Sequence, residues 1–281
     1  MEHDDGYSFG IGVFETMLVK GGRCIMMERH MDRLLHGLDV LGLRIDFDPS
    51  VVHRAVSDGS LDGRVLKVEV SERNTILTDR RNPYDPSDYE KGFSLRTSSV
   101  RRNETSPLTF IKSLCCADSI MERRKAVADG FDEVLFLNLH GEVCECASSN
   151  IFFAEGNRVS TPCISSGMLP GTLRSFVIDE FDVEERTILP EEIPSFTGCF
   201  ITNSVMGVMP VSSIDGHGFD DRTVAGGVDR AYRRAVEDGL RRNTVVRTMY
   251  LSAEQPKSLY STRISLASTH WWPSLDMAAA S

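Results

Sequence analysis

The amino-acid sequence predicts an α+β fold in two lobes, a small N-terminal α/β lobe and a larger β-rich C-terminal lobe. Runs typical of β-strands dominate both halves of the 281 residues, and helical runs are interspersed between them without regular alternation. A polar stretch, RRNETSPL at 101–108, ends in Ser-Pro and is predicted to link the two halves. A chain of this length can bury a substantial core.

The predicted small lobe covers residues 1–100 and begins with a β-hairpin. Strand-like runs at 12–19 and 23–27 flank Lys-Gly-Gly-Arg, and a Gly-Gly pair is typical of a tight hairpin turn. The run at 28–43 places Met31 and four leucines on one apolar face, which predicts a helix. Three further strands are expected in this lobe, at 64–71, 74–79 and 93–100.

The predicted large lobe covers residues 109–242 and combines short strands with three helices. The helices are expected at 117–129, 170–181 and 226–240. The strands are expected at 132–138, 142–145, 149–155, 158–161, 198–204 and 207–215. Residues 243–281 show no periodicity and are predicted to form a flexible tail.

Composition and charge exclude several classes of function. The formal net charge of −10 argues against a nucleic-acid surface, which needs a basic footprint. No apolar run approaches the ~20 residues of a membrane span, and the acidic start MEHDDGYSFG lacks the apolar stretch of a signal peptide. The seven cysteines have no zinc-ligand spacing, so no metal site is expected, and reduced thiols in the cytoplasm are the simplest interpretation.

Lys112 is the first candidate for chemistry. The chain contains 25 arginines but only 6 lysines, and Lys112 follows the apolar pair Phe110-Ile111 just before a helical run. A lysine amine can lose its proton and attack a carbonyl, whereas an arginine guanidinium stays protonated. On this stretch alone, an ordinary surface lysine is the alternative.

Three polar stretches at the ends of predicted elements are further candidates. SSGMLPGTLR at 165–174 leads glycine-rich backbone into a helix start, which suits a phosphate, and TNS at 202–204 ends a strand. CECASSN at 144–150 places Glu145 on a strand expected to be buried, where a carboxylate needs a partner. Singly, the first two stretches are better explained as a simple helix start and a strand-end turn, and an internal salt bridge is the alternative for Glu145. Together, an amine, a buried carboxylate and a phosphate cradle suggest pyridoxal 5′-phosphate as the cofactor.

Five motifs carry a resemblance to a known family. They are GYSFGIGVFET near the start, ERHMDRL at 28–34, KSL at Lys112, GFDEVLFLNLHGEVCECASSNIF at 130–152, and SSGMLPGTLR at 165–174. From Gly6 to about residue 240 the chain resembles the class IV aminotransferases, the fold-type IV pyridoxal-phosphate enzymes. Members of that family include branched-chain aminotransferases, D-amino acid aminotransferases and 4-amino-4-deoxychorismate lyases. Five motifs in the family's order are a specific match.

The resemblance implies roles for individual residues. Lys112 would link covalently to the cofactor and later shuttle protons, and Glu145 would keep the pyridine nitrogen protonated. Arg33 would pair with the phosphate, for which a guanidinium is well suited. Further phosphate contacts are implied from the backbone N–H groups of Thr172 and Leu173 and from Asn203 and Ser204.

The chain also departs from the family's pattern around the substrate. Cys115 and Cys116 stand where Asn and Tyr are frequent, and Leu18 stands where many relatives have an arginine for the substrate's carboxylate. Arg80 or Arg81 is a candidate replacement, from the neighbouring lobe or a second subunit, and a solvated loop charge is the alternative for each. Phe14 of the opening motif is a further candidate substrate contact.

Three functions remain open at this point. ITNSVMGVMPV at 201–211 is similar to the corresponding run of the lyases, which favours a 4-amino-4-deoxychorismate lyase that releases pyruvate and p-aminobenzoate. An aminotransferase of branched-chain or D-amino acids is the alternative, and a pyridoxal-phosphate binder without activity is a third. The expected partners are a small amino substrate and a second copy of the chain, with neither nucleic acid nor membrane. In the expected homodimer, loop 78–86 reaches the active site of the neighbouring subunit.

Overall fold

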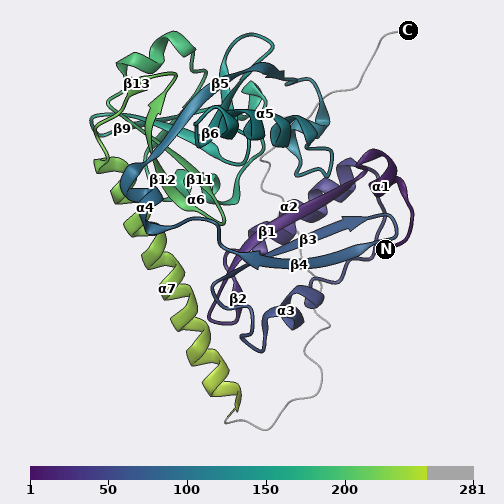
Figure 1. Ribbon diagram of the computed structural model, residues 1–281. Helices are drawn as coiled ribbons and strands as arrows, with labels where there is room; N and C mark the ends of the chain where they lie inside the picture. Colours follow the sequence, from purple (N-terminus) through teal and green to yellow (C-terminus); the bar gives the residue numbers. More distant parts are fainter. Residues whose placement is uncertain (252–281) are drawn as a thin grey trace. The chain divides into compact units, whose positions relative to one another are not determined.

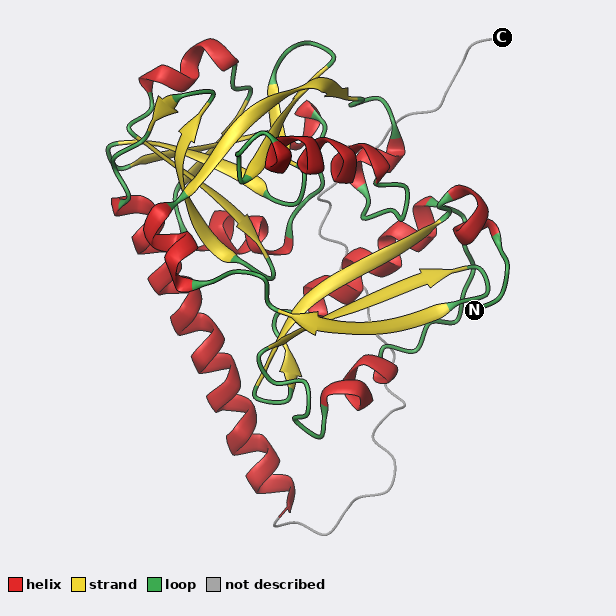
Figure 2. Cartoon of the chain, viewed as in Figure 1, coloured by secondary structure: helices red, strands yellow, loops and turns green. Residues whose placement is uncertain are grey.

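Residues 1–251 are described by the computed structural model, with side chains described to residue 240. Residues Met1–Asp238 form one compact unit that contains two β-sheets, and Gly239–Ser281 are assigned to a second unit. The two sheets and their covering helices correspond to the two predicted lobes (Figures 1 and 2). Within the described part of the chain, no helix is long and apolar enough to cross a membrane.

The small lobe is a four-stranded antiparallel sheet with helix α2 along one face (Figure 1). Its strands, in spatial order, are β2 (Arg23–Cys24), β1 (Gly12–Lys20), β3 (Arg64–Ser71) and β4 (Thr75–Arg81). Its helices are α1 (Asp5–Phe9), α2 (Met27–Val40) and α3 (Ser50–Val56). The β1–β2 turn uses Gly21 and Gly22, both with positive φ, which is the backbone that a two-residue hairpin turn requires.

The core of the small lobe follows from alternation along β1. Val13, Met17 and Val19 point toward α2, where they meet an apolar stripe that includes Leu34 and Leu38. The other side chains of β1 therefore project from the opposite face of the sheet. Leu18, on that second face, packs against buried residues of the large lobe, so this face is directed at the large lobe.

The large lobe is a mixed sheet of nine strands. Its main path runs β10 (Val183–Arg186), β9 (Arg158–Pro162), β8 (Asn150–Glu155), β11 (Gly198–Asn203), β12 (Gly207–Ile214), β5 (Phe93–Arg102), β6 (Glu133–Asn138) and β7 (Val143–Cys146), with β13 (His217–Gly218) paired to β12. The helices are α4 (Pro86–Lys91), α5 (Ala117–Ala128), α6 (Thr172–Glu180) and α7 (Thr223–Leu251), with 3₁₀ turns η1 (Pro107–Phe110), η2 (Ile164–Ser166) and η3 (Pro190–Ser195). Its core is rich in phenylalanine, with Phe152 stacked on Phe200.

The structure corrects the predicted boundary between the lobes. Strand β5, which was predicted to belong to the small lobe, pairs with β12 and β6 in the large sheet. The stretch 101–108 is not a linker, because β5 continues to Arg102 and η1 begins at Pro107. The chain instead leaves the small sheet after Arg81 and reaches the large one through α4, which packs on β12. A charge-rich loop and a charge-rich strand end look alike in sequence, and only strand pairing separates them.

The predicted tail also needs correction at its start. Residues 243–251 belong to α7, which is longer than the helix predicted at 226–240. Residues 252–281, the rest of the predicted flexible tail, lie outside the described residues. Strand β10 was not predicted, because its residues VEER lie at the edge of the sheet and show no apolar alternation.

Candidate active site

Lys112 lies where the large-lobe segment after η1 attaches to strand β1. The Lys112 carbonyl accepts a 2.9 Å hydrogen bond from the Phe14 amide, and the Leu114 amide donates to the Gly12 carbonyl at 2.9 Å. Val13 and Ser113 form an antiparallel bridge between these contacts. Residues 112–114 therefore extend the small sheet, and Lys112 Nζ lies 4.6 Å from the centroid of the Phe14 ring.

The environment of Lys112 favours the neutral amine. Burial lowers the pKa of Lys112 to about 8, and the nearby Arg33 guanidinium contributes to this lowering, while Glu15 and Glu145 act in the opposite direction. At that pKa a substantial fraction of the amine is unprotonated at neutral to mildly alkaline pH. The neutral form is the one that attacks a carbonyl or accepts a proton.

A buried charge network lies beneath Lys112 on the α2 side of β1. Arg33 Nε donates to Glu15 Oε1 at 2.7 Å and Arg33 Nη2 donates to Glu15 Oε2 at 2.8 Å, which is a bidentate pair. Glu15 is fully buried, and Arg33 and His30 hold its pKa at about 2 against the effect of burial. Arg33 Nη1 also donates to the Pro170 carbonyl at 2.9 Å. Within the described part of the chain, three of the five N–H donors of Arg33 have partners, and the other two can serve a ligand.

His30 continues this network into the large lobe. Its Nδ1 lies 2.6 Å from Glu15 Oε2 and its Nε2 lies 3.4 Å from Thr172 Oγ1. Burial lowers the pKa of His30, so the ring is neutral, with Nδ1–H donating to Glu15 and Nε2 accepting from the Thr172 hydroxyl. Thr172 Oγ1 lies 2.8 Å from Ser204 Oγ, which must then be the donor. The chain of contacts thus links Arg33, Thr172 and Ser204, three of the predicted phosphate residues.

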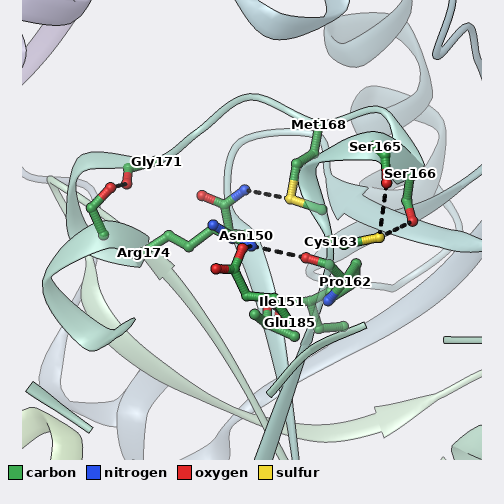
Figure 3. Close-up of polar contacts among 12 residues, drawn as sticks. Asn150, Ile151, Pro162, Cys163, Ser165, Ser166, Met168, Gly171, Arg174 and Glu185 are labelled. Carbon is green, nitrogen blue, oxygen red and sulfur yellow. Dashed lines mark hydrogen bonds and ion pairs between the residues drawn. The ribbon is translucent and has the colours of Figure 1, made fainter. Parts of the chain in front are cut away.

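The start of helix α6 is shaped by Asn150. Asn150 Nδ2 donates to the Leu169 carbonyl at 2.9 Å. The same nitrogen approaches Met168 Sδ at 3.7 Å (Figure 3). A Cβ at Gly171 would overlap Asn150 Oδ1, so only glycine fits at the N-cap. The amides of Thr172 and Leu173 belong to the first helical turn, whose N–H groups have no partner within a helix. These amides are therefore available to an anion.

Arg174 is a second arginine near this turn, but it does not face a ligand. Its Nη2 donates to the Pro162 carbonyl at 2.9 Å and to Glu185 at 2.6 Å, and the side chain is 3% exposed (Figure 3). Arg174 therefore ties α6 to strands β9 and β10 and is a structural group.

Glu145 is buried on β7 and is held from two sides. Glu145 Oε2 accepts from the Leu169 amide at 3.2 Å, and Arg102 Nη2 lies 3.3 Å from Oε1. Burial raises the pKa of Glu145, while Arg102 lowers it. Arg102 is itself fixed by the Ser119 hydroxyl at 3.0 Å and by the Phe136 ring at 4.0 Å. Glu145 thus forms the internal salt bridge that was the alternative interpretation. The carboxylate still has lone pairs that can accept a further hydrogen bond.

Asn203 and Ser204 have different environments. Asn203 Oδ1 accepts from the amides of Val205 and Met206 at 3.0 and 2.7 Å, and Asn203 Nδ2 donates to the Ser148 carbonyl at 3.2 Å. The side chain of Asn203 therefore holds the turn together, whereas that of Ser204 joins the network at Thr172. Thr202 Oγ1 is buried and has no hydrogen-bond partner among the described residues.

The cross-strand register separates the two substrate candidates on β4. Phe14 pairs with Glu69, and Arg80 pairs with Val65, which is the partner of Leu18. Directly opposed residues project from the same face, so Arg80 lies on the same face of the sheet as Phe14 and Leu18. Arg81 lies on the opposite face, next to Arg64 in the register.

Comparison with known proteins identifies the family. The model of the family described as amino-transferase class IV matches residues 12–214, which is most of the chain. The chain belongs to the class IV aminotransferases.

Two curated relatives differ in their named activities. A protein from Rickettsia felis named "Probable branched-chain-amino-acid aminotransferase" is 26% identical over 80% of this chain and 87% of its own. The aminodeoxychorismate lyase of Bacillus subtilis is 25% identical over 75% of this chain and 80% of its own. Two relatives of nearly equal identity to this chain thus differ in activity, because one is named a transferase and the other a lyase.

Solved structures agree on the fold. The 4-amino-4-deoxychorismate lyase from Pseudomonas aeruginosa superposes with a TM-score of 0.72 at 22% identity, covering 83% of this chain and 95% of the lyase. A hypothetical aminotransferase from Mycobacterium tuberculosis, with α-ketoglutarate and PMP bound, gives a TM-score of 0.74 at 21% identity, covering 84% and 93%. The predicted two-lobed fold-type IV architecture is confirmed.

Class IV aminotransferases use pyridoxal phosphate, and the residues of this site fit that cofactor. The site offers an amine with a lowered pKa at Lys112 and a buried carboxylate at Glu145. It also offers the free first turn of α6 and the two spare donors of Arg33. An aldehyde, a ring nitrogen and a phosphate each find a chemically matched group here.

Glu15, His30 and Arg102 contact the candidate residues Arg33, Thr172 and Glu145, but none of the three was predicted from the sequence. A signal for Glu15 exists, because it interrupts an otherwise apolar run on the core-facing side of β1. His30 likewise lies on the buried face of α2, beside Met31. An acid and a histidine that both fall on core-facing positions indicate a buried polar pair. Arg102 carries no such signal, since it lies in a run of charged residues.

Proposed function

We propose that the protein is a 4-amino-4-deoxychorismate lyase that uses Lys112 and pyridoxal phosphate to release pyruvate and p-aminobenzoate. The observation that carries the assignment of the site is the buried Lys112 amine, whose pKa is lowered to about 8 and which interacts electrostatically with Arg33, Glu15 and Glu145. Pyridoxal phosphate, when bound, supplies an aldehyde for the amine and a ring that withdraws electrons from the amine-bearing carbon. The protein supplies the position of each group and the movement of protons.

Each residue has a defined task in this proposal. The Lys112 amine removes the proton from the amine-bearing carbon of the substrate. The bond between the ring carbon and the enolpyruvyl oxygen then breaks as the ring becomes aromatic, and the departing enolate takes up a proton to give pyruvate. Glu145 accepts a hydrogen bond from the protonated ring nitrogen, and the Arg102 guanidinium opposes the rise in the Glu145 pKa that burial causes. Arg33, the amides of Thr172 and Leu173, and Ser204 hold the phosphate. Asn203 acts through the turn that presents Ser204.

Support for the lyase comes from the run ITNSVMGVMPV at 201–211, which is similar to the lyase version of this segment. In the structure this run is the end of β11, the turn braced by Asn203, and β12. The run therefore lies beside the proposed phosphate site. The likeness of the chain to the Bacillus subtilis lyase is consistent with the proposal.

Amino-group transfer is the second candidate, and the names of relatives such as the Rickettsia felis protein favour it. The same residues would serve it, because both reactions begin with removal of a proton from the amine-bearing carbon. The two reactions differ in the next step, since a transferase returns that proton to the cofactor's carbon and a lyase expels a leaving group. A binder without activity is disfavoured by the presence of both Lys112 and Glu145 in a buried, interacting site.

One assay separates these functions. Purified protein loaded with pyridoxal phosphate is given 4-amino-4-deoxychorismate, and the release of p-aminobenzoate is followed by fluorescence. In parallel, L-leucine, D-alanine and L-glutamate are tested for half-reactions by the change in cofactor absorbance. Turnover with release of p-aminobenzoate supports the lyase, whereas rapid half-reactions without release of p-aminobenzoate would replace it with the transferase. Loss of both activities in the loaded protein would leave the binder.

We further propose that the protein acts as a homodimer in the cytoplasm. Exposed Tyr7 and Phe9 on α1, which are 67% and 70% exposed, offer apolar surface to a second copy. All seven cysteines are free thiols, which is typical of a reducing compartment. Light scattering at micromolar concentration tests the assembly, and a fully active monomer would refute it.

A further inference from the structure

The face of the small sheet that carries Phe14 also carries a second amine. Thr16 on β1 is paired with Lys67 on β3, and Phe14 is paired with Glu69. The side chains of Lys67 and Glu69 therefore project from the same face as Phe14, toward the large lobe. Lys67 Nζ lies 4.8 Å from the centroid of the Phe14 ring, and Lys112 Nζ lies 4.6 Å from the same centroid. One aromatic ring thus contacts both the reactive amine and Lys67.

Lys67 is held by a partner that a ligand can replace. Lys67 Nζ lies 2.6 Å from Glu69 Oε1, two residues along the same strand. The side chains of Lys67 and Glu69 are 37% and 25% exposed, so solvent and small molecules reach the pair. An ion pair this accessible contributes little to folding stability, which makes the exchange of one carboxylate for another inexpensive.

Glu69 of this pair also lines an open pocket of about 260 Å³. The same pocket is lined by Ile76 of this sheet face, by Tyr7 of α1 and by Leu114, two residues after Lys112. Because the Phe14 ring contacts both amines, a small organic acid whose amine reacts beside Lys112 would place its remainder along that ring, toward Lys67. Leu18, which also lies on this face, offers no charge.

We propose that Lys67 is a specificity-determining residue that binds a carboxylate of the substrate remote from the reacting amine, and that Glu69 occupies Lys67 until this carboxylate arrives. The proposal rests on the proposed function only in taking the cofactor beside Lys112 as the place where the substrate amine reacts. It selects substrates with an additional carboxylate over those with a wholly apolar remainder. It holds for a lyase and for a transferase alike.

The test uses the protein loaded with pyridoxal phosphate and two unreactive acids of equal length, glutarate and pentanoate. Isothermal titration measures the dissociation constant of each acid for wild type, Lys67→Met, Lys67→Arg and Glu69→Gln. Wild type is expected to bind glutarate about tenfold more tightly than pentanoate, the scale of a charge-assisted contact in a partly buried site. Lys67→Met should abolish the preference, Lys67→Arg should retain it, and Glu69→Gln should strengthen it.

The matched control is Lys91→Met, which removes a lysine paired with Asp132 on the outer surface, with both contacts at 2.9 Å. This variant should keep the wild-type preference. Thermal unfolding of every variant confirms that it is folded. Equal binding of the two acids by wild type, binding of neither acid, or a preference that survives in Lys67→Met would each overturn the proposal. Failure of the wild type to take up pyridoxal phosphate would instead refute the proposed function, so the two failures are distinct.

Discussion

Glu15 and Arg33 form a bidentate ion pair that joins the central strand of the small lobe to its covering helix, with contacts of 2.7 and 2.8 Å. Glu15 is fully buried, and the Arg33 side chain is 12% exposed. The same arginine reaches the Pro170 carbonyl next to α6, so one pair connects three elements of the site. The pair therefore has both a structural and a functional consequence.

Replacement of Glu15 tests the structural part. Glu15→Gln leaves a largely buried guanidinium without its counter-charge, and we expect the free energy of unfolding to fall by about 3–5 kcal/mol. Urea denaturation at pH 7 measures the change. Asp179→Asn is the matched control, because it breaks the exposed Arg29–Asp179 pair and should cost less than about 1 kcal/mol. If the free energy of unfolding fell by a similar amount in both variants, the buried pair would contribute no more to stability than the exposed one.

The pH dependence of cofactor capture tests the environment of Lys112. Burial and Arg33 lower the pKa of this amine from 10.5 to about 8, so the reactive neutral form grows as pH rises and saturates above the pKa. Mixing cofactor-free protein with pyridoxal phosphate should give a rate that increases about tenfold per pH unit below pH 7 and levels off above pH 9. Stopped-flow absorbance follows the reaction, and Lys112→Ala should give no bound-cofactor band. A midpoint near 10 would show that the amine is not perturbed.

Glu145→Gln separates cofactor binding from catalysis. The variant keeps Arg33, the α6 amides and Ser204, the proposed phosphate ligands, so it should still bind pyridoxal phosphate, as seen by absorbance. Removal of the substrate proton should slow by about a hundredfold or more, because each ~1.4 kcal/mol of lost stabilisation costs a factor of ten. Glu155→Gln, at the exposed end of β8, is the control. Near-wild-type turnover of Glu145→Gln would reduce Glu145 to a salt-bridge partner of Arg102.

Ser204 and Asn203 are expected to fail in different ways. Ser204→Ala removes a hydroxyl of the Thr172 network, and we expect the dissociation constant of pyridoxal phosphate to rise about tenfold with little change in stability. Asn203→Ala removes three hydrogen bonds of the turn and should lower the free energy of unfolding by about 1–3 kcal/mol. Cofactor titration and urea denaturation are measured on both variants. Identical behaviour would argue against the separate roles.

Arg80 and Arg81 form a matched pair on adjacent positions of one strand. Arg80 shares the sheet face of Phe14 and Lys67, whereas Arg81 projects from the other face. Arg80→Ala should raise the KM for a carboxylate substrate several-fold with kcat nearly unchanged, and Arg81→Ala should alter neither constant. Steady-state kinetics with whichever substrate the enzyme turns over measures both constants. An effect confined to Arg81 would invert the assignment.

Much of the fold is predictable because its elements carry local signals. The apolar stripe of α2, the Gly-Gly turn after β1 and the alternation of β3 each arise from residues that are close in sequence. The membership of β5 is not local, since it depends on pairing with strands more than thirty residues away. The edge strand β10 has no apolar alternation because solvent, and not a core, meets most of its side chains.

The site shows the same division. Lys112, Arg33 and Glu145 stand out by residue type and motif, but their partners are found only in three dimensions. Arg102 meets Glu145 across 43 positions of sequence, and Thr172 meets His30 across 142. Asn203 and Ser204 are adjacent and equally polar, yet one side chain folds back on its own turn. Sequence reveals which groups are present, and packing decides what each of them contacts.

The attachment of residues 112–114 to strand β1 has a consequence for motion. Lys112 follows η1 in the large-lobe part of the chain, but its carbonyl is bonded to the Phe14 amide at 2.9 Å. If the four-stranded sheet rotates against the nine-stranded one, the amine travels with Phe14 and Lys67, while Glu145 stays with β7. Such a hinge motion would change the distance between Lys112 and Glu145 and keep the distance between Lys112 and the Phe14 ring. Opening and closing of the two lobes would then control whether Lys112 and Glu145 can act on the cofactor at the same time.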